Sequence, residues 1–336
     1  MPLALPERFE PDDFVVDEIP AYPPSGSGGH TFLQVEKRGW TTEALARVLA
    51  RAAGVGPRDV GYAGRKDRHA VTTQWFSVPG FDPEAALALD LDRVRVLEAT
   101  PHESKLRTGH LRGNRFTVTL HDVDAGDARA ASDRLDRLAR DGMPNRFGRQ
   151  RFGHDGDNAA GGIALLRGET RPRDRREARF LLSALQSAVF NEALHRRALP
   201  LGELEVGDVA VVHPSGGLFV VEDLTREAPR AAAFEVSPTG PLFGTRSGRR
   251  DPAPEGAPAA REAEAAASLG VDLSAPLTLP RGVRLPGARR ALRVRPEEPG
   301  VEHEADRLRL RFTLPPGSYA TVLLEELSGV DAMAAP

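Results

Sequence analysis

An uninterrupted alternation of polar and apolar side chains runs through residues 307–314, RLRLRFTL. Because successive side chains of a strand point to opposite faces of a sheet, this pattern predicts a strand whose four apolar residues share one buried face. Phe116, Val118 and Leu120 repeat the pattern within Arg115–Leu120. Further strands are predicted at Phe14–Ile19, His30–Lys37, Val71–Val78 and Arg93–Ala99.

Other segments have the periodicity of amphipathic helices. Apolar residues recur at helical spacing from Ala44 to Ala52, after a threonine cap, Thr41 or Thr42. Asp127–Arg140 and Arg173–Ala198 are predicted as two more helices, and the segment PNRFGRQRFGHDGDN between them is predicted to be a loop. The chain therefore mixes helices with strands.

The length of 336 residues exceeds what one hydrophobic core usually serves, so two domains are expected. From about residue 200 the chain changes to short Val-rich strands interrupted by Gly and Pro, which indicates that a second domain or an insertion begins near there. Within it, Arg249–Ala260 is predicted to be a Pro- and Ala-rich link.

Several protein classes are excluded by what the chain lacks. It has no cysteine, so disulfides, thiolate catalysis and cysteine metal sites are impossible. It has no export signal and no run of about 18 apolar residues, so we expect a cytoplasmic protein without a membrane span. Walker loops, dinucleotide-binding Gly motifs, HExxH and GxSxG are missing, and the nine histidines show no ligand spacing, so neither a metal nor a nucleotide cofactor is expected.

The formal net charge of −3 provides no long-range attraction for a nucleic acid. Positive charge is nevertheless concentrated by segment. Residues 101–120 carry Lys105, Arg107, Arg112 and Arg115 against the single acid Glu103. Such a run either contacts phosphates or forms a solvated surface, and a phosphate-binding track requires several runs to converge in space.

The segment GYAGRKDRHAVTTQWFSV, residues 61–78, places one acid among several cations. Asp67 is surrounded in sequence by Arg65, Lys66 and Arg68. Neighbouring cations keep a carboxylate ionised, as a nucleophile or base that attacks a neutral base or sugar requires. The same pattern is also typical of a structural ion pair at the surface.

Three more segments have residues suited to contacting bases. KLRTGHLRGNRFTVTL, residues 105–120, places Asn114 at a loop-to-strand junction, where it orients a carboxylate, hydrogen-bonds a base edge or only forms a turn. PNRFGRQRFG, residues 144–153, alternates arginines with Phe147 and Phe152, which suits backbone neutralisation and base stacking, or a loop anchored in the core. Tyr319 opens a helix and offers its ring either to a stacked base or to the core.

Over its whole length, GYAGRKDRHAVTTQWFSV resembles the signature of the TruD family of tRNA pseudouridine synthases. The resemblance spans nearly the entire chain. It continues, in family order, through PDDFVV with the following glycine-rich stretch and His30, KLRTGHLRGNRF, PNRFGRQRFG, SALQSAVFNEAL, SPTGPLFG and LPPGSYATVLLEEL.

The resemblance implies that the chain isomerises a uridine in tRNA, at position 13 in bacterial members of the family, without a cofactor or a metal. The C1′–N1 glycosidic bond breaks, the uracil rotates, and the base is rejoined through C5. Because a base cannot be attacked inside a stacked stem, it is expected to flip into an aromatic-lined pocket beside an ionised carboxylate. That carboxylate adds to the sugar or the base, or removes a sugar proton, and the sequence leaves these alternatives open.

The family's functional residues carry over by motif. Asp67 matches the catalytic aspartate, Asn114 the asparagine near it, Phe14 a pocket aromatic, and Tyr319 the ring that contacts the flipped base. Phe116 completes the predicted substrate-binding set. Contacts to the RNA backbone are predicted for Arg8, Lys66, Arg68, Lys105, Arg107, Arg112, Arg149 and Arg151.

Three positions depart from the family pattern. Arg146 stands where a Tyr is often found, Tyr319 where a Phe is common, and Arg8 near where a Lys is frequent. Tyr319 keeps the ring and adds a hydroxyl that can hydrogen-bond the base or Asp67. The departures concern fine contacts rather than the activity.

The resemblance also implies an α+β fold, in which a pseudouridine synthase-type mixed, largely antiparallel sheet is flanked by helices and carries an inserted, family-specific α/β domain. We place the catalytic domain at residues 1–150 and 305–336 and the insertion at 151–304. A monomer that acts on tRNA is expected. The alternatives are a non-catalytic tRNA-binding or folding factor, and the same chemistry on another RNA.

Overall fold

The computed structural model describes residues 3–153, 156–213, 215–245 and 252–329. The chain divides into two compact units. Unit 1 comprises Met1–Asp136, Pro296–Gly317 and Leu327–Gly329, and unit 2 comprises Arg137–Arg295, Ser318–Glu326 and Val330–Pro336.

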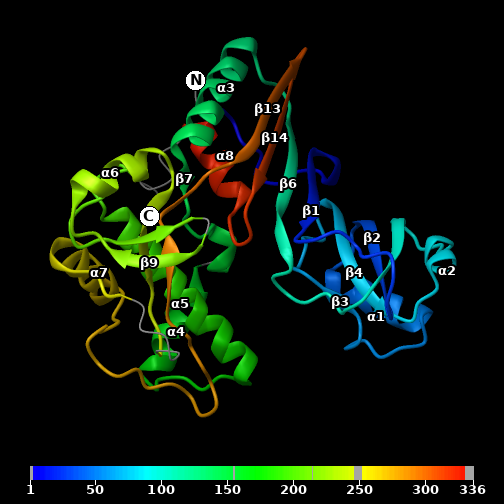
Figure 1. Ribbon diagram of the computed structural model, residues 1–336, viewed down its shortest axis with the longest axis horizontal. Helices are drawn as coiled ribbons and strands as arrows, with labels where there is room; N and C mark the ends of the chain where they lie inside the picture. Colours follow the sequence, from blue (N-terminus) through cyan, green and yellow to red (C-terminus); the bar gives the residue numbers. More distant parts are fainter. Residues whose placement is uncertain (1–2, 154–155, 214, 246–251, 330–336) are drawn as a thin grey trace. The chain divides into compact units, whose positions relative to one another are not determined.

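Unit 1 is built on one eight-stranded sheet in the order β13-β14-β6-β1-β4-β2-β5, with β3 paired to β4 at its side (Figure 1). Only the pairing of β1 with β4 is parallel, and the other described pairings are antiparallel. The strands are β1 (Phe14–Pro20), β2 (His30–Arg38), β3 (Gly61–Tyr62), β4 (Val71–Pro79), β5 (Val94–His102), β6 (Leu111–Leu120), β13 (Glu297–Glu304) and β14 (Arg307–Leu314).

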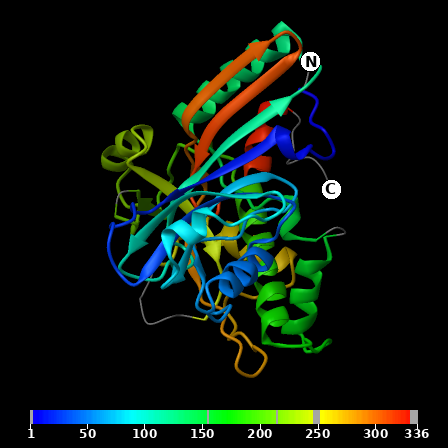
Figure 2. The same cartoon turned by 90° about the vertical axis from the view of Figure 1, so that its right-hand side faces the viewer.

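The alternating segment 307–314 forms β14, which lies between β13 and β6, as both views show (Figure 2). Its four apolar side chains, Leu308, Leu310, Phe312 and Leu314, are fully buried, as predicted. The sheet is thus mixed and largely antiparallel, and the predicted α+β fold class is confirmed.

Helices cover parts of this sheet. Unit 1 contains η1 (Pro11–Asp13), α1 (Thr42–Ala52) and α2 (Pro83–Leu87), whereas α3 (Ala125–Asp141) and α8 (Ala320–Ser328) belong partly to each unit. Helix α1 begins as predicted, because the Thr41 hydroxyl accepts a hydrogen bond from the Ala44 amide at 3.2 Å. Its buried face packs against β2 and β4, which holds the ends of these strands in place; the core there includes Leu33, Leu45, Leu49 and Phe76.

Unit 2 combines helices with a four-stranded antiparallel sheet in the order β11-β10-β8-β9. Helix α5 runs through its centre and packs against α4 and α7 (Figure 1). The elements are β7 (Met143–Pro144), η2 (Arg149–Arg151), α4 (Asp157–Leu166), α5 (Arg175–His195), β8 (Val209–Val212), β9 (Gly217–Val220), α6 (Leu224–Ala232), β10 (Val236–Leu242), α7 (Gly256–Ser268), β11 (Ala288–Ala291) and β12 (Arg293–Val294), which pairs with β7.

Two parts of unit 2 differ from the sequence-based expectation. Helix α4 begins inside the segment that was predicted to be a loop. Its paired glycines are poor helix formers and lower its helix propensity, but they allow close packing on α5. A Cβ at Gly162 would lie 2.6 Å from the carbonyl oxygen of Leu181. Helix α7 likewise begins within Arg249–Ala260, predicted to be a link, of which residues 249–251 lie outside the described part of the chain.

The compact units and the predicted domains have different boundaries. Strand β13 lies in the sheet of unit 1, although its residues fall within the predicted insertion at 151–304. Segment 137–150 belongs to unit 2, although it was assigned to the catalytic domain. Which segments are specific to the family remains a prediction.

Candidate active site

Asp67 lies on the loop between β3 and β4, and its side chain is exposed. One carboxylate oxygen accepts a hydrogen bond from the main-chain amide of His69 at 2.9 Å. The carboxylate is therefore anchored locally while it remains open to solvent, which is the state in which it can meet a large substrate.

Two buried polar side chains hold the main chain of this loop. Gln74 donates to the carbonyl oxygen of Gly64 at 2.6 Å. Thr42 accepts from the amide of Lys66 at 3.0 Å and donates to Gln74 Oε1 at 3.0 Å. Both side chains are fully buried, so the loop is connected to helix α1 and strand β4 through hydrogen bonds from the interior of unit 1. Neither residue was predicted to support the Asp67 loop. The available signal in the sequence was a polar residue, Gln74, among the buried positions of β4.

Lys66, which precedes Asp67, forms a buried ion pair with Glu18 of β1. The exposed fractions of the two side chains are 6% and 0%. The second carboxylate oxygen of Glu18 accepts from the main-chain amide of Trp75 at 3.1 Å. This burial argues against the phosphate contact predicted for Lys66 and favours a structural role.

Asn114, Phe14 and Phe116 lie on the same face of the sheet as Glu18. In the antiparallel pairing of β1 with β6, Glu18 is opposite Asn114, and Val16, two residues earlier, is opposite Phe116. The ring centroids of Phe14 and Phe116 are 6.0 Å apart. The side-chain oxygen of Asn114 is buried and has no hydrogen-bond partner among the described residues. The structure thus brings an aromatic pair and an unpartnered acceptor to one face.

Tyr319 belongs to unit 2, whereas Asp67, Asn114, Phe14 and Phe116 belong to unit 1. Its ring is half-buried and contacts Phe147 edge-on, with centroids 6.0 Å apart. Arg146, one of the positions that depart from the family pattern, directly precedes Phe147 in the sequence. It is buried and pairs with Glu325 of α8 at 2.6 Å.

The cations predicted to bind the RNA backbone have different surroundings. In unit 1, Arg8 and Arg68 are exposed and both contact the ring of His69, at 2.5 and 3.1 Å. These two guanidinium groups lie close to Asp67, as a backbone contact near the reacting nucleotide requires.

The remaining cations of unit 1 are Lys105, Arg107 and Arg112. Lys105 donates to the main-chain carbonyl of Arg58, and Arg112 pairs with Glu297 at 3.5 Å. Arg107 is exposed and has no side-chain partner among the described residues, so its guanidinium is available to a phosphate.

In unit 2, the exposed Arg149 lies on η2, but Arg151 is connected to helix α5. Its guanidinium donates to Ser183 at 2.7 Å and to Ser187 at 3.3 Å. Arg151 therefore fixes the loop PNRFGRQRFG, whereas Arg149 is open to a ligand.

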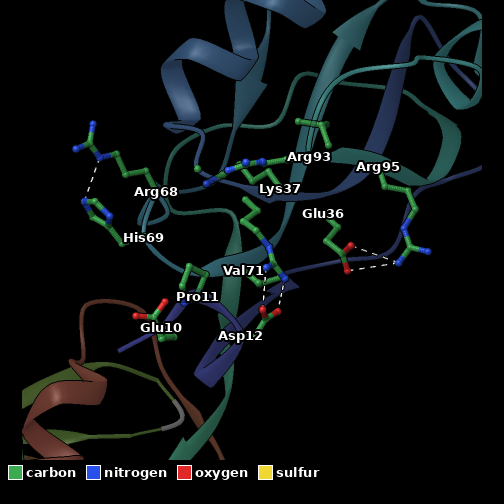
Figure 3. A pocket seen from close by; sticks show the side chains of 13 residues that line it. Glu10, Pro11, Asp12, Glu36, Lys37, Arg68, His69, Val71, Arg93 and Arg95 are labelled. Atoms are coloured by element: carbon green, nitrogen blue, oxygen red, sulfur yellow. Dashed lines mark hydrogen bonds and ion pairs between the residues drawn. The ribbon is translucent and has the colours of Figure 1, made fainter. Parts of the chain in front are cut away.

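A pocket of about 780 Å³ lies beside the Asp67 loop, at the end of β2 and β4 (Figure 3). By strand register, its Arg38 and Val71 share the sheet face of Val15, opposite to the face of Phe116. Two of its acids pair with its cations, Asp12 with Arg38 and Glu36 with Arg95. The lining is formed by Glu10, Pro11, Asp12, Glu36, Lys37, Arg38, Gly39, Arg68, His69, Val71, Arg93, Val94 and Arg95.

Within the described ranges, no group of three or more His, Asp or Glu side chains is arranged to hold a metal ion. In the same part of the chain, no helix is both long and apolar enough to cross a membrane.

The chain matches the sequence profile of the family described as tRNA pseudouridine synthase D (TruD) over residues 8–172 and 174–327. It belongs to the TruD family. The predicted family and the predicted tRNA pseudouridine synthase function are thereby confirmed.

Individual relatives agree with this membership. A tRNA pseudouridine synthase D of Anaeromyxobacter dehalogenans (strain 2CP-C) is 46% identical over 334 residues, which cover 97% of this chain and 93% of the relative. One of Thermus thermophilus is 43% identical over 329 residues, covering 97% of this chain and 89% of the relative.

A solved structure described as a tRNA pseudouridine synthase D of Methanosarcina mazei matches with a TM-score of 0.73. The match covers 96% of this chain and 92% of that one at 23% sequence identity. At that identity the likeness concerns the fold, which it supports. The modified position and the roles of single residues remain predictions.

Proposed function

We propose that this TruD family member converts uridine 13 of tRNA to pseudouridine, with Asp67 as the reacting carboxylate. The observation that carries the proposal is the contrast between an exposed carboxylate and the buried polar network beneath its loop. A fixed main chain under an accessible carboxylate keeps the reacting atoms in a near-attack arrangement, and this lowers the entropic part of the barrier.

The reaction is an isomerisation and needs no other reactant. The C1′–N1 bond of uridine breaks, the uracil rotates, and a C5–C1′ bond forms; C5 then loses its proton, and N1 ends with one. Addition of Asp67 to the sugar, its addition to the base, and removal of a sugar proton all satisfy this balance. Each requires an ionised carboxylate within contact distance of the nucleotide.

The substrate-binding residues have separate tasks in this proposal. The rings of Phe14 and Phe116 provide an apolar surface for the flipped uracil. Tyr319 is assigned to the base by the family motif, and its ring packs edge-on against Phe147 within unit 2. The unpartnered oxygen of Asn114 accepts a hydrogen bond from uracil N3–H. Cytosine has no hydrogen at N3, so this contact favours uridine.

Wild-type protein and Asp67→Asn are to be compared on an unmodified tRNA transcript, following both tritium release from 5-labelled uridine and tRNA binding. We expect Asp67→Asn to reduce product formation by at least about 1,000-fold, with tRNA affinity within about threefold, because the carboxylate acts in the reaction rather than in binding. Asp92→Asn, an exposed aspartate of unit 1, is the matched control and should be fully active.

The outcomes separate the alternatives. Equal activity of Asp67→Asn and wild type would contradict the proposed role of Asp67. A wild-type protein that binds tRNA but releases no tritium would support the non-catalytic factor. Mapping of the product to another position, or activity only on another RNA, would leave the chemistry in place and change the substrate.

A further inference from the structure

Lys37, at the end of β2, is a buried cation that contacts the main chain of Asp67, the proposed reacting residue. Its exposed fraction is 1%. In the strand register, Lys37 is opposite Thr72, Thr72 is opposite Val16, and Val16 is opposite Phe116. Residues opposite each other across a sheet share a face, so the side chain of Lys37 lies on the face that carries the proposed substrate-binding residues.

The ammonium of Lys37 is bound by main-chain oxygens. Nζ donates to the carbonyl of Trp40 at 2.8 Å and to the carbonyl of Asp67 itself at 3.3 Å. Within the described residues, Lys37 forms no ion pair with a carboxylate. Burying a cation without a carboxylate partner lowers the stability of a fold. We therefore expect Lys37 to make a contact that another side chain could not make.

The use of lysine in this chain is itself selective. Only Lys37, Lys66 and Lys105 are lysines among 45 Lys and Arg residues. The structure places all three around the segment that carries Asp67: Lys66 pairs with Glu18, and Lys105 binds the carbonyl of Arg58, just before β3. A compact ammonium has three donors, so it can bind two main-chain carbonyls at once in a buried position.

We propose that Lys37 is a positioning residue for Asp67: its ammonium binds the main-chain carbonyl of Asp67 from beneath and thereby holds the carboxylate in its reacting position. The inference rests on the proposed role of Asp67 and adds a residue that acts through it. Thr42 and Gln74 hold Gly64 and Lys66, whereas Lys37 is the buried side chain that binds the main chain of Asp67.

The charge of Lys37 changes within the pH range in which the activity can be measured. Burial and the neighbouring charge of Lys66 lower its pKa from 10.5 to about 8, while Asp67 and Glu43 act in the opposite direction. Lys37 is therefore mostly protonated at neutral pH and loses its charge as pH rises through about 8. The rate of the chemical step should fall in that range, because the charge-assisted bond to Asp67 weakens.

Stability should change in the other direction. The unfolded chain binds the Lys37 proton up to about pH 10.5, whereas the folded chain releases it at about pH 8. The contribution of Lys37 to the free energy of unfolding therefore increases with pH between these values. A loss of activity above pH 8 that comes from Lys37 is for this reason separable from unfolding.

The test measures single-turnover pseudouridine formation and tRNA affinity from pH 6 to 9.5 for wild type, Lys37→Met and Asp67→Asn. Lys37→Met should lower the rate by about 10- to 100-fold and lack the fall above pH 8, with tRNA affinity within about threefold, since a small misplacement of a reacting group has effects of this size. Arg38→Met is the matched control, because Arg38 is the next residue of β2 and its side chain lies on the opposite face of the sheet. This variant should form pseudouridine at the wild-type rate.

A chemical rescue separates positioning from a general packing defect. Because the chain has no cysteine, Lys37→Cys can be alkylated at that position alone with 2-bromoethylamine in denaturant, which rebuilds an ammonium of lysine length. After refolding beside identically treated wild type, the alkylated protein should regain at least about tenfold over Lys37→Cys, as expected if the charge itself positions Asp67.

Full turnover by folded Lys37→Met, an alkaline fall that persists in this variant, or no gain on alkylation would overturn the inference. If Asp67→Asn loses product while Lys37→Met matches wild type, only the role of Lys37 is refuted. If wild type itself forms no pseudouridine, the proposed function and the role of Lys37 fail together.

Discussion

Glu18 and Lys66 show how single residues support a site without touching the substrate. Glu18 joins three parts of unit 1, because it lies on β1, pairs with Lys66 of the Asp67 loop and accepts from the amide of Trp75 on β4. Both charges are buried, so each depends on the other for compensation. Removing one partner of such a pair usually costs more than the pair contributes, because the other charge remains buried.

Glu18→Gln should therefore lower the free energy of unfolding by about 3–5 kcal/mol, the range observed when a buried pair loses one member. Denaturant unfolding monitored by circular dichroism measures this. The matched control is Glu36→Gln, whose exposed pairing with Arg95 at 3.4 Å should contribute less than about 1 kcal/mol. Equal effects of the two substitutions would show that the Glu18 pair is not a structural anchor.

At the level of elements, β4 has the greatest influence on the site. It is the parallel partner of β1 and the antiparallel partner of β2, and it is buried on both faces through most of its length. Its polar residues therefore point into packed surroundings, where Gln74 binds the loop that precedes the strand. The same strand thus provides the core and the support of the Asp67 loop.

The contact between β6 and β14 leaves no room for a side chain at Gly113, the residue before Asn114. A Cβ there would lie 2.6 Å from the carbonyl oxygen of Leu314. Gly113→Ala should destabilise the protein by about 1–3 kcal/mol through separation of the two strands, and thermal unfolding measures the effect. At Gly29 a Cβ would meet nothing within 4 Å, so Gly29→Ala is the control. If both variants unfold at the same temperature as wild type, the approach of Leu314 to Gly113 does leave room for a methyl group.

For the whole molecule, the relevant electrostatic quantity is the local arrangement of cations rather than the net charge of −3. Lys66 and Arg151 are occupied by internal partners, whereas Arg107 and Arg149 are exposed. Binding of a polyanion should therefore depend on a few open arginines, and its salt dependence should report how many of them meet phosphates.

Arg107→Gln should weaken tRNA binding similarly for different sequences and reduce the slope of log affinity against log salt by about 1, the change expected for one lost phosphate contact. A salt titration of tRNA affinity measures this slope. Arg309→Gln removes a similarly exposed arginine that is paired with Glu302 at 3.3 Å, and should leave the slope unchanged. An unchanged slope in Arg107→Gln would remove Arg107 from the binding surface.

The sequence by itself determined the elements whose burial follows a local period. The alternation at 307–314 predicts β14, and the Thr41 cap with its helical repeat predicts α1, because both patterns reflect which face of a single element is covered. The family signature predicted Asp67 as the reacting carboxylate, because the motif is contiguous along the chain.

Only the tertiary structure decided which distant residues meet. No local pattern indicates that β1 pairs in parallel with β4, that Glu18 meets Lys66, or that Lys37 binds the carbonyl of Asp67. Helix α4 was missed because its glycines lower its intrinsic propensity, and packing on α5 compensates for this. Local sequence sets the period of burial, whereas the partner of each buried polar group depends on strand order and register, which form only when the whole sheet assembles.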